Sequence, residues 1–478
     1  MARFKYPRGC PHAVLYTDKS PHASAISYYQ RPSKEARLAA ATLSNKQSSE
    51  STSSDEEPPI SAFPGVNLTP QDALDLDPKE PPQSLKSFAR ESHRNSLTTR
   101  RKTLYVIDSP SLAPDAACMS DWVKPQTVVG TNSELEHEQP KADDIAEYIR
   151  AFYHGLDVKV LHDQCVLTRC RLSSSKSRQA DNRGHVDLVI NNGTPTRVDF
   201  RASGDGVAKG QLNLSHMLDG LLANVPKDAF AVVLLTHFDL YEDEEDDFCA
   251  GRAFGGSRIC IVSTFRYNPV LDEHNNVDHA HSWPASHCQV YVNRLWEKDE
   301  PELKDRHKEF DPAVMIHCNN TSEAPLAAAV ATSRGILWPT TPADWNGFWL
   351  TRVCRTAAHE LGHCVGMGHC VYYACMMQST ANIADDVRQP PYLCPVCEAK
   401  VAYTIRGEAV KSSRNVQMRR NVEAQWVVEA HRRMRDYCEE RSHIGMLKAY
   451  GAWLTARLKQ IESEREKDDV EIIVIDSD

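Results

Sequence analysis

The segment His359–Cys370, HELGHCVGMGHC, constrains this chain more than any other part of it. His359 and His363 are four residues apart, so on a helix they share one face and can bind one metal ion together. Gly366 lets the chain leave the helix in a conformation that strains other residues, and His369 follows as a third ligand. Three imidazoles leave the fourth position of a tetrahedral zinc for water, so the spacing predicts an open zinc site.

Glu360 stands next to the first histidine and can reach a zinc-bound water without binding the metal. Zinc lowers the pKa of such a water towards ~7. Glu360 would then take a proton from the water during attack on a carbonyl and deliver it to the leaving amine. Two alternatives stay open, namely core histidines on an ordinary helix and a zinc site with a dormant glutamate. The second is the more serious alternative.

Cysteines follow the motif in two pairs, Cys370 with Cys375 and Cys394 with Cys397. Four thiolates fill a tetrahedral shell, so the pairs predict a closed, structural zinc site, with free cysteines as the alternative. In an extended segment His369 and Cys370 point to opposite sides, and the closed site would then steady the third histidine. Met377 is predicted in a tight turn beneath the catalytic metal, with ordinary core packing as the alternative.

Together these residues resemble the archaemetzincins, whose pattern joins H-E-x-x-H-x-x-G-x-x-H to C-x4-C-x-M and a distal C-x-x-C. This chain reads HELGHCVGMGHC, VYYAC, MM and CPVC, with sixteen residues between Met377 and Cys394, one fewer than the usual spacer. The match is tight over His359–Cys397. Weaker similarity extends over residues 103–405 and includes IAEYIRAFYHGLDVKVL and RICIVSTFRYN.

The resemblance implies a zinc-dependent metallopeptidase that acts on peptides or proteins, with two zinc ions per chain and narrow, aminopeptidase-like specificity. It implies a compact metzincin fold in which a twisted mixed sheet lies above the cleft, and its edge strand, which we place near Phe254–Thr264, pairs with substrate. It also implies a role for each site residue: catalytic ligands His359, His363 and His369; general base Glu360; structural ligands Cys370, Cys375, Cys394 and Cys397; and Met-turn residue Met377.

Composition narrows the class of protein further. The net charge of −10 over 478 residues does not favour a nucleic-acid-binding surface. No apolar run approaches the ~20 residues of a membrane-spanning helix, and the N-terminus lacks the apolar core of a secretory signal. Most of the fifteen cysteines are scattered, which is typical of a reducing compartment. We therefore expect a cytoplasmic or nuclear protein that is not secreted and does not enter a membrane.

The pattern of elements predicts an α/β fold in four parts. Residues 1–98, which include the acidic run Lys46–Pro59, are expected to be disordered. Residues 99–405 form the peptidase domain, with strands at 103–108, 156–161, 229–236 and 258–264 and helices at 142–155 and 212–222. Residues 165–184 read as a loop, 185–190 as a strand or an embellishment, and the motif helix begins near Phe348. Residues 406–467 form two amphipathic helices.

Residues 468–478 form a tail, VEIIVIDSD at its end, that resembles a SUMO-interacting motif. Its apolar run could add a strand to the sheet of SUMO or of a SUMO-modified protein through Ile472, Ile473, Val474 and Ile475. The alternatives are a fraying terminus and a final strand that docks on its own domain. If the motif is real, the chain could also be a catalytically weak, zinc-stabilised adaptor that is recruited to SUMO-modified proteins.

Overall fold

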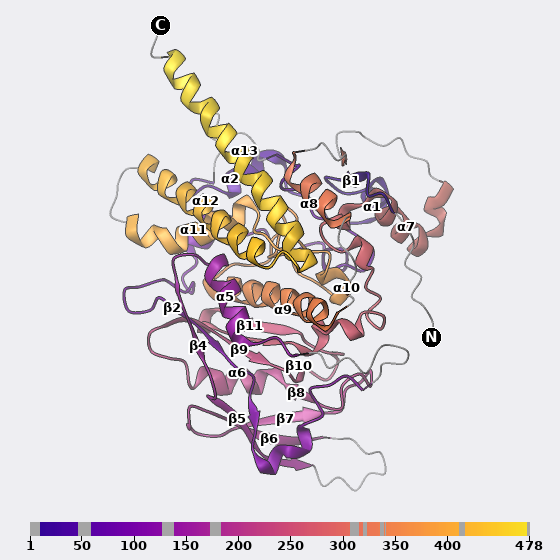
Figure 1. The fold of residues 1–478 in the computed structure, drawn as a ribbon, viewed down its shortest axis with the longest axis vertical. Helices are drawn as coiled ribbons and strands as arrows, with labels where there is room; N and C mark the ends of the chain where they lie inside the picture. Colours follow the sequence, from indigo (N-terminus) through magenta and orange to yellow (C-terminus); the bar gives the residue numbers. More distant parts are fainter. Residues whose placement is uncertain are drawn as a thin grey trace. The chain divides into compact units, whose positions relative to one another are not determined.

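The computed structural model describes residues 10–45, 59–126, 138–172, 183–305, 315–318, 323–334, 339, 341–410 and 416–475 (Figure 1). Its contacts divide the chain into two units, each built from separate stretches of sequence. Unit 1 takes residues 1–3, 92–275 and 339–366, and unit 2 takes residues 4–91, 276–338 and 367–478. The division does not follow the contiguous domain expected over residues 99–405.

A five-stranded mixed sheet of unit 1 has the strand order β11-β12-β9-β2-β4. Its strands are β2 (Thr103–Ile107), β4 (Asp157–Leu161), β9 (Ala229–Thr236), β11 (Gly251–Phe254) and β12 (Ile259–Ser263). All neighbours pair in parallel except β11, which is antiparallel to β12. The edge strand predicted near Phe254–Thr264 is wrong, because β12 is an inner strand and β11, which precedes it, forms the edge.

A six-stranded sheet of unit 1 has the order β10-β8-β7-β6-β5-β3. Its strands are β3 (Ser111–Leu112), β5 (Cys165–Leu172), β6 (Gly184–Ile190), β7 (Thr196–Arg201), β8 (Gln211–Asn213) and β10 (Asp239–Tyr241). The loop expected over residues 165–184 is wrong where β5 lies, because alternating burial of Cys165 and Leu167 gives one face of that strand to the core. Residues 173–182 lie outside the described residues.

Helices of unit 1 complete its core. α6 (Leu214–Leu222), capped by the side chain of Asn213, contacts strands of both sheets and joins them in one apolar cluster. α5 (Ala142–Phe152) and α9 (Pro342–Val365) contact the five-stranded sheet. The shorter 3₁₀ turns are η2 (Pro114–Met119), η3 (Gly255–Ser257), η4 (Phe265–Tyr267) and η5 (Pro269–Leu271).

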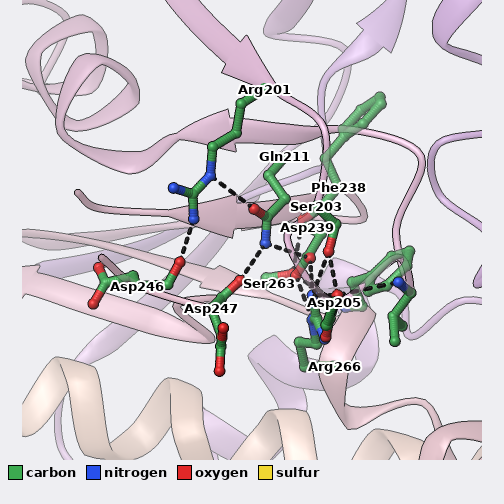
Figure 2. A network of polar contacts seen from close by, with 12 residues as sticks. Arg201, Ser203, Asp205, Gln211, Phe238, Asp239, Asp246, Asp247, Ser263 and Arg266 are labelled. Atoms are coloured by element: carbon green, nitrogen blue, oxygen red, sulfur yellow. Dashed lines mark hydrogen bonds and ion pairs between the residues drawn. The ribbon is translucent and has the colours of Figure 1, made fainter. Parts of the chain in front are cut away.

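A buried polar network holds the segment that follows β12 against the six-stranded sheet (Figure 2). The guanidinium of Arg266 is fully buried and forms ion pairs with Asp239 of β10 and with Asp205. Gln211 of β8 donates from Nε2 to Asp239 Oδ2 at 2.9 Å and accepts from Arg201 Nε at 3.0 Å. Because buried charges need such partners, the network fixes the path of the chain between β12 and η5.

Unit 2 contains a two-stranded sheet of β1 (Val14–Tyr16) and β13 (Met315–His317), paired antiparallel. Its N-terminal and middle helices are α1 (Pro21–Ile26), α2 (Lys34–Ala40), α3 (Ala73–Leu76), α4 (Leu85–Arg90), α7 (Gln289–Asp299), α8 (Pro325–Arg334) and α10 (Ile383–Asp386). Three 3₁₀ turns, η6 (His279–His281), η7 (Ala285–His287) and η8 (Pro301–Asp305), flank α7.

The disorder expected for residues 1–98 is wrong where the structure describes them, although residues 1–9 and 46–58 lie outside the description. Phe63 is fully buried, and its ring centroid lies 5.5 Å from that of Trp453. Trp453 Nε1 also donates to the Ala62 carbonyl at 3.3 Å. Composition averaged over the segment hid these anchors, because a few buried aromatic residues are enough to order a chain against existing helices.

Three helices end the described chain, α11 (Pro395–Val410), α12 (Val416–Glu440) and α13 (Gly445–Ile475). α12 and α13 contact each other, in agreement with the two predicted C-terminal helices. The backbone of the tail is helical up to Ile475, whereas a SUMO-interacting motif binds as an extended strand. The side chains of residues 467–475 and all of residues 476–478 lie outside the description. Among the described residues, no helix combines the length and apolarity that crossing a membrane requires.

Candidate metal centres

α9 carries His359 and His363 and begins at a capping box. The Thr341 hydroxyl accepts from the Asp344 N–H at 3.2 Å, and the Asp344 carboxylate accepts from the Thr341 N–H at 3.1 Å. The start predicted near Phe348 therefore lies inside the observed helix. The helix ends at Gly366, whose φ of 107° belongs to the left-handed region, as the motif predicted.

Two buried contacts hold α9 within unit 1. Arg352 donates to both carboxylate oxygens of Asp272, at 2.7 and 2.9 Å, and both side chains are almost fully buried. Tyr153 follows α5, and its hydroxyl donates to the carbonyl of Ala358 at 2.6 Å. These bonds fix α9 against the sheet near the two histidines. A metal site requires such a rigid scaffold.

The imidazoles of His359 and His363 face each other on α9. Their Nε2 atoms are 3.0 Å apart, and both side chains are only partly buried. Two nitrogen ligands of one tetrahedral zinc, each ~2.0–2.1 Å from the ion, lie about 3.3 Å apart. The pair therefore fits two adjacent positions around a zinc ion, and its partial exposure leaves room for further ligands.

Glu360 lies one residue along α9 and is 7% exposed. A Cβ atom at Gly251 of β11 would stand 3.5 Å from its Oε1, so the carboxylate lies directly beside the edge strand. Burial raises the pKa of Glu360 to about 8, while the nearby Arg252 opposes that shift. A carboxyl group held in this way is suited to proton transfer near neutral pH.

His369 belongs to unit 2, where its ring is positioned by a carboxylate. His369 Nδ1 lies 2.9 Å from Glu80 Oε1, and its side chain is 34% exposed. A histidine whose Nδ1–H is given to a carboxylate presents Nε2 to a metal, which is the usual arrangement of zinc-binding histidines. Sequence reasoning missed Glu80, because no spacing connects a residue so far from the motif with His369.

The four-cysteine cluster, also in unit 2, brings together all the predicted structural ligands, Cys370, Cys375, Cys394 and Cys397. Every member is at most 1% exposed, and the Sγ atoms of Cys370 and Cys394 are 3.5 Å apart. Hydrogen bonds among the thiols lower the pKa of Cys370 well below its ordinary value, and the Lys400 ammonium acts in the same direction. The donor set fits a closed tetrahedral zinc.

Backbone donors and a nearby cation also stabilise negative charge at the cluster. The N–H groups of Cys394 and Met377 point at Cys375 Sγ, at 3.2 and 3.5 Å. Lys400 is 1% exposed, and its Nζ donates to Gln83 Oε1 at 2.9 Å. Hydrogen bonds to thiolate sulfur and buried positive charge are typical of the surroundings of zinc-bound cysteines.

Met377 lies in a tight turn, as the sequence predicted. The Gln378 N–H donates to the Cys375 carbonyl at 3.0 Å, which closes a turn with Met377 inside it. The Cys370 N–H donates to the Met377 carbonyl at 2.7 Å, and the Met377 side chain is fully buried. The turn is thus tied by its backbone to the residue that follows the third histidine.

The sequence model of peptidase family M54 matches residues 341–403, a stretch that runs from the start of α9 through both cysteine pairs. The chain belongs to the archaemetzincin family of peptidases. It is a zinc-dependent metallopeptidase of that family, which implies peptide substrates.

Relatives resemble the chain well beyond the motif. Archaemetzincin-2 of Rattus norvegicus is 22% identical over 349 residues, which cover 73% of this chain and 72% of the rat protein. Archaemetzincin-2 of Homo sapiens is 21% identical, over 72% of this chain and 71% of the human protein. The archaemetzincin crystal structure from Methanopyrus kandleri covers 65% of this chain and 98% of its own, at 16% identity and a TM-score of 0.28.

Proposed function

We propose that this archaemetzincin hydrolyses peptide bonds with Glu360 as general base and with His359, His363 and His369 as ligands of the catalytic zinc. The observation that carries the proposal is the arrangement on α9, where two imidazoles with their Nε2 atoms 3.0 Å apart share the helix with a buried carboxylate that lies beside the edge strand of a sheet. His369 follows Gly366 by three residues, so the chain length alone keeps it within ~11 Å of the helix end.

The bound zinc would supply an acidified water and would polarise the substrate carbonyl. The protein itself would move the proton. Glu360 would accept it at a carboxylate oxygen and pass it to the nitrogen of the scissile bond as that bond breaks. Its burial favours the exchange, because a carboxyl group shielded from bulk water holds and releases a proton closer to neutral pH.

The substrate would bind as an extended strand along β11. Among the strands that the structure describes, β11 pairs with β12 alone, and through Gly251 it passes beside Glu360. A peptide added to its free side would gain backbone hydrogen bonds that are independent of side chains. Its carbonyl groups would then run past the general base. We infer narrow, aminopeptidase-like specificity from the family resemblance alone.

The four-cysteine cluster would hold a second, structural zinc, so each chain would bind one catalytic and one structural ion. The complete burial of the cluster supports this role, because four thiolates fill the coordination shell and leave no position for water. Met377 would form the Met-turn beneath the catalytic metal, and the bonds from its backbone to Cys370 and Cys375 support a rigid turn.

The decisive experiment measures cleavage of a peptide library by the wild-type protein and by Glu360→Gln, together with zinc per chain in both. We expect the variant to keep its zinc and to lose ~10²–10⁴-fold in turnover, because one general base contributes about that much. Glu242→Gln is the matched control. Glu242 pairs with Arg252, the cation that also acts on Glu360, at 2.9 Å.

The control variant should cleave peptides at the wild-type rate, since it changes the charge near the site but no proton-transferring group. Hydrolysis by Glu360→Gln at the wild-type rate would contradict the proposed mechanism. A wild-type protein that binds zinc and cleaves no member of the library would instead favour the adaptor function.

Binding of the tail to SUMO and a cytoplasmic or nuclear location stay predictions. The NMR signals of SUMO, followed as the full-length protein is added, test the binding of the tail, with the Ile473→Ala variant as the control. SUMO signals that do not shift at millimolar tail concentration would end the idea. The adaptor function further requires that partner binding be the same in Glu360→Gln and in the wild type.

A further inference from the structure

A second group of cysteine and histidine side chains lies in unit 2, away from the four-cysteine cluster in sequence. The ligand atoms of Cys10, His12 and His281 all lie within 4.8 Å of one another. Cys288 Sγ lies 3.5 Å from Cys10 Sγ. Cys10 and His12 precede β1, His281 ends η6 and Cys288 caps α7, so the fold gathers ligands that no sequence motif links.

Three of the four ring nitrogens in the two histidines of this group have no hydrogen-bond partner among the described residues. His281 is 3% exposed, and its Nε2 is buried without a hydrogen-bond partner among the described residues. Within the same part of the chain, neither ring nitrogen of His12 has a partner, and both are buried. Buried polar atoms are nearly always satisfied in folded proteins, so the group lacks something that accepts their lone pairs.

His281 is already oriented as a metal ligand. Its Nδ1 lies 3.0 Å from Asp278 Oδ2, and Arg294 Nη2 donates to the same oxygen at 3.0 Å. Its ring stacks on Tyr291 with the centroids 4.3 Å apart and the planes 3° from parallel. A carboxylate on Nδ1 fixes the tautomer that presents Nε2, the unpartnered nitrogen, to an ion.

The separation of the two thiols is close to the one that a shared zinc ion would give. The 3.5 Å between the Sγ atoms of Cys10 and Cys288 equals the distance between Cys370 and Cys394 in the four-cysteine cluster. Two sulfur ligands of one tetrahedral zinc, each ~2.3 Å from it, lie about 3.8 Å apart. A disulfide would bring the sulfurs to about 2.0 Å, so the two thiols are not bonded to each other.

We propose that Cys10, His12, His281 and Cys288 form a further zinc site, of the Cys₂His₂ type, in addition to the catalytic and four-cysteine sites. Two thiolates and two imidazoles favour zinc over magnesium or calcium and complete a tetrahedral shell without water. The site is therefore structural. It fastens the segment before β1 to the start of α7, next to the bridge between Leu15 and Cys288.

Zinc per chain in the full-length protein, measured by inductively coupled plasma mass spectrometry, tests the site. His281→Ala and Cys10→Ser should each bind one zinc fewer than the wild type. His22→Ala is the matched control, because His22 is a buried histidine of the same unit outside the group. It should keep the wild-type count. The test depends on a difference of one ion, so it stands whatever the occupancy of the other two sites.

Cobalt substitution supplies a second reading of the same variants. Replacing zinc by cobalt in the wild type should give a thiolate-to-cobalt charge-transfer band. His281→Ala should lower the intensity of that band by the part that the thiolates of Cys10 and Cys288 contribute. Equal zinc counts in the wild type, His281→Ala and Cys10→Ser would overturn the proposal, and so would an unchanged cobalt band in His281→Ala.

Thiol protection in the wild type keeps the proposal testable even if a variant fails to fold. Cys10 is only partly buried, and Cys118 is exposed. In zinc-loaded protein, iodoacetamide should modify Cys118 and spare Cys10, and chelation should expose Cys10 to the reagent. Modification of Cys10 as fast as Cys118 in the loaded protein would overturn the site. A disulfide between Cys10 and Cys288 in protein prepared with reductant would also overturn it.

Discussion

The histidine pair on α9 and the four-cysteine cluster hold their ligand atoms in opposite ways. The histidines come from two successive turns of one helix and are partly exposed, whereas the cysteines come from a loop, a tight turn and a helix start and are at most 1% exposed. A helix can present two ligands and leave the rest of the coordination shell open, which serves catalysis. Irregular backbone can surround an ion completely, which serves stability.

This contrast predicts that losing a cysteine ligand unfolds the protein, while losing a histidine ligand only inactivates it. Cys375→Ser should lose the structural zinc, worth on the order of 10 kcal/mol in small zinc domains, and unit 2 should melt at room temperature. Circular dichroism melts together with zinc counts measure this. His363→Ala should keep the wild-type melting temperature. Cys438 is a buried thiol of unit 2 outside the cluster, and Cys438→Ala should lower the melting temperature only slightly. Equal melting temperatures for Cys375→Ser and His363→Ala would break the comparison.

The position of the histidine pair depends on the protein scaffold around α9, whereas the four-cysteine cluster depends on its metal. Asp272→Ala leaves the guanidinium of Arg352 buried without its carboxylate, so we expect a loss of about 3–5 kcal/mol in the free energy of unfolding. Urea unfolding measures the loss. Glu138→Gln, which breaks the exposed pair with Lys141, is the control and should leave the urea midpoint unchanged. A midpoint in Asp272→Ala that matches this control would show that the pair does not hold α9.

Glu80 sharpens the comparison, because it contacts His369, the third predicted ligand of the catalytic zinc, from outside the motif. Glu80→Gln should weaken binding of the catalytic zinc or lower activity by about 10–100-fold, since the carboxylate orients His369 through Nδ1. Zinc titration against a chelator, with the kcat and KM of peptide cleavage, separates the two effects. Glu91→Gln, an exposed carboxylate after α4, is the control. A wild-type zinc affinity and kcat in Glu80→Gln would remove Glu80 from the site.

Acid should destabilise the fold of unit 1 through His237, a partly buried histidine that is not among the predicted metal ligands. Burial lowers the pKa of His237 from 6.5 to about 4, and its Nδ1 lies 3.0 Å from Thr264 Oγ1. The unfolded chain therefore binds more protons between these values, and stability falls as the pH drops from about 6.5 to about 4. His237→Gln should flatten this part of the stability curve and run parallel to the wild type above pH ~7. Two curves of equal slope throughout would contradict the shift.

Local patterns made the motif, the buried strand β9 and the alternation of strands and helices predictable. The start of α9 was missed although its signal is local, because Thr341 and Asp344 form a capping box around Pro342. β5 was missed because its many polar residues hid the alternation of buried positions. Reading composition in long windows concealed both signals.

Other features could not be predicted because their partners are distant in sequence. Glu80 meets His369, and Cys10 meets Cys288, only after the chain has folded. The order of residues 59–98 depends in the same way on aromatic contacts of Phe63 with Tyr392 and Trp453. Such contacts carry no fixed spacing, so a single sequence offers no pattern from which to read them.

Stepwise removal of zinc from the wild-type protein tests most directly the claim that the partly exposed histidine site is catalytic and the buried cysteine site structural. As a chelator is raised, we expect one zinc to leave first and to take all peptide cleavage with it, while the circular dichroism spectrum and melting temperature stay unchanged. Added zinc should then restore activity. Cleavage that survives loss of the first ion, or unfolding that accompanies it, would contradict the account.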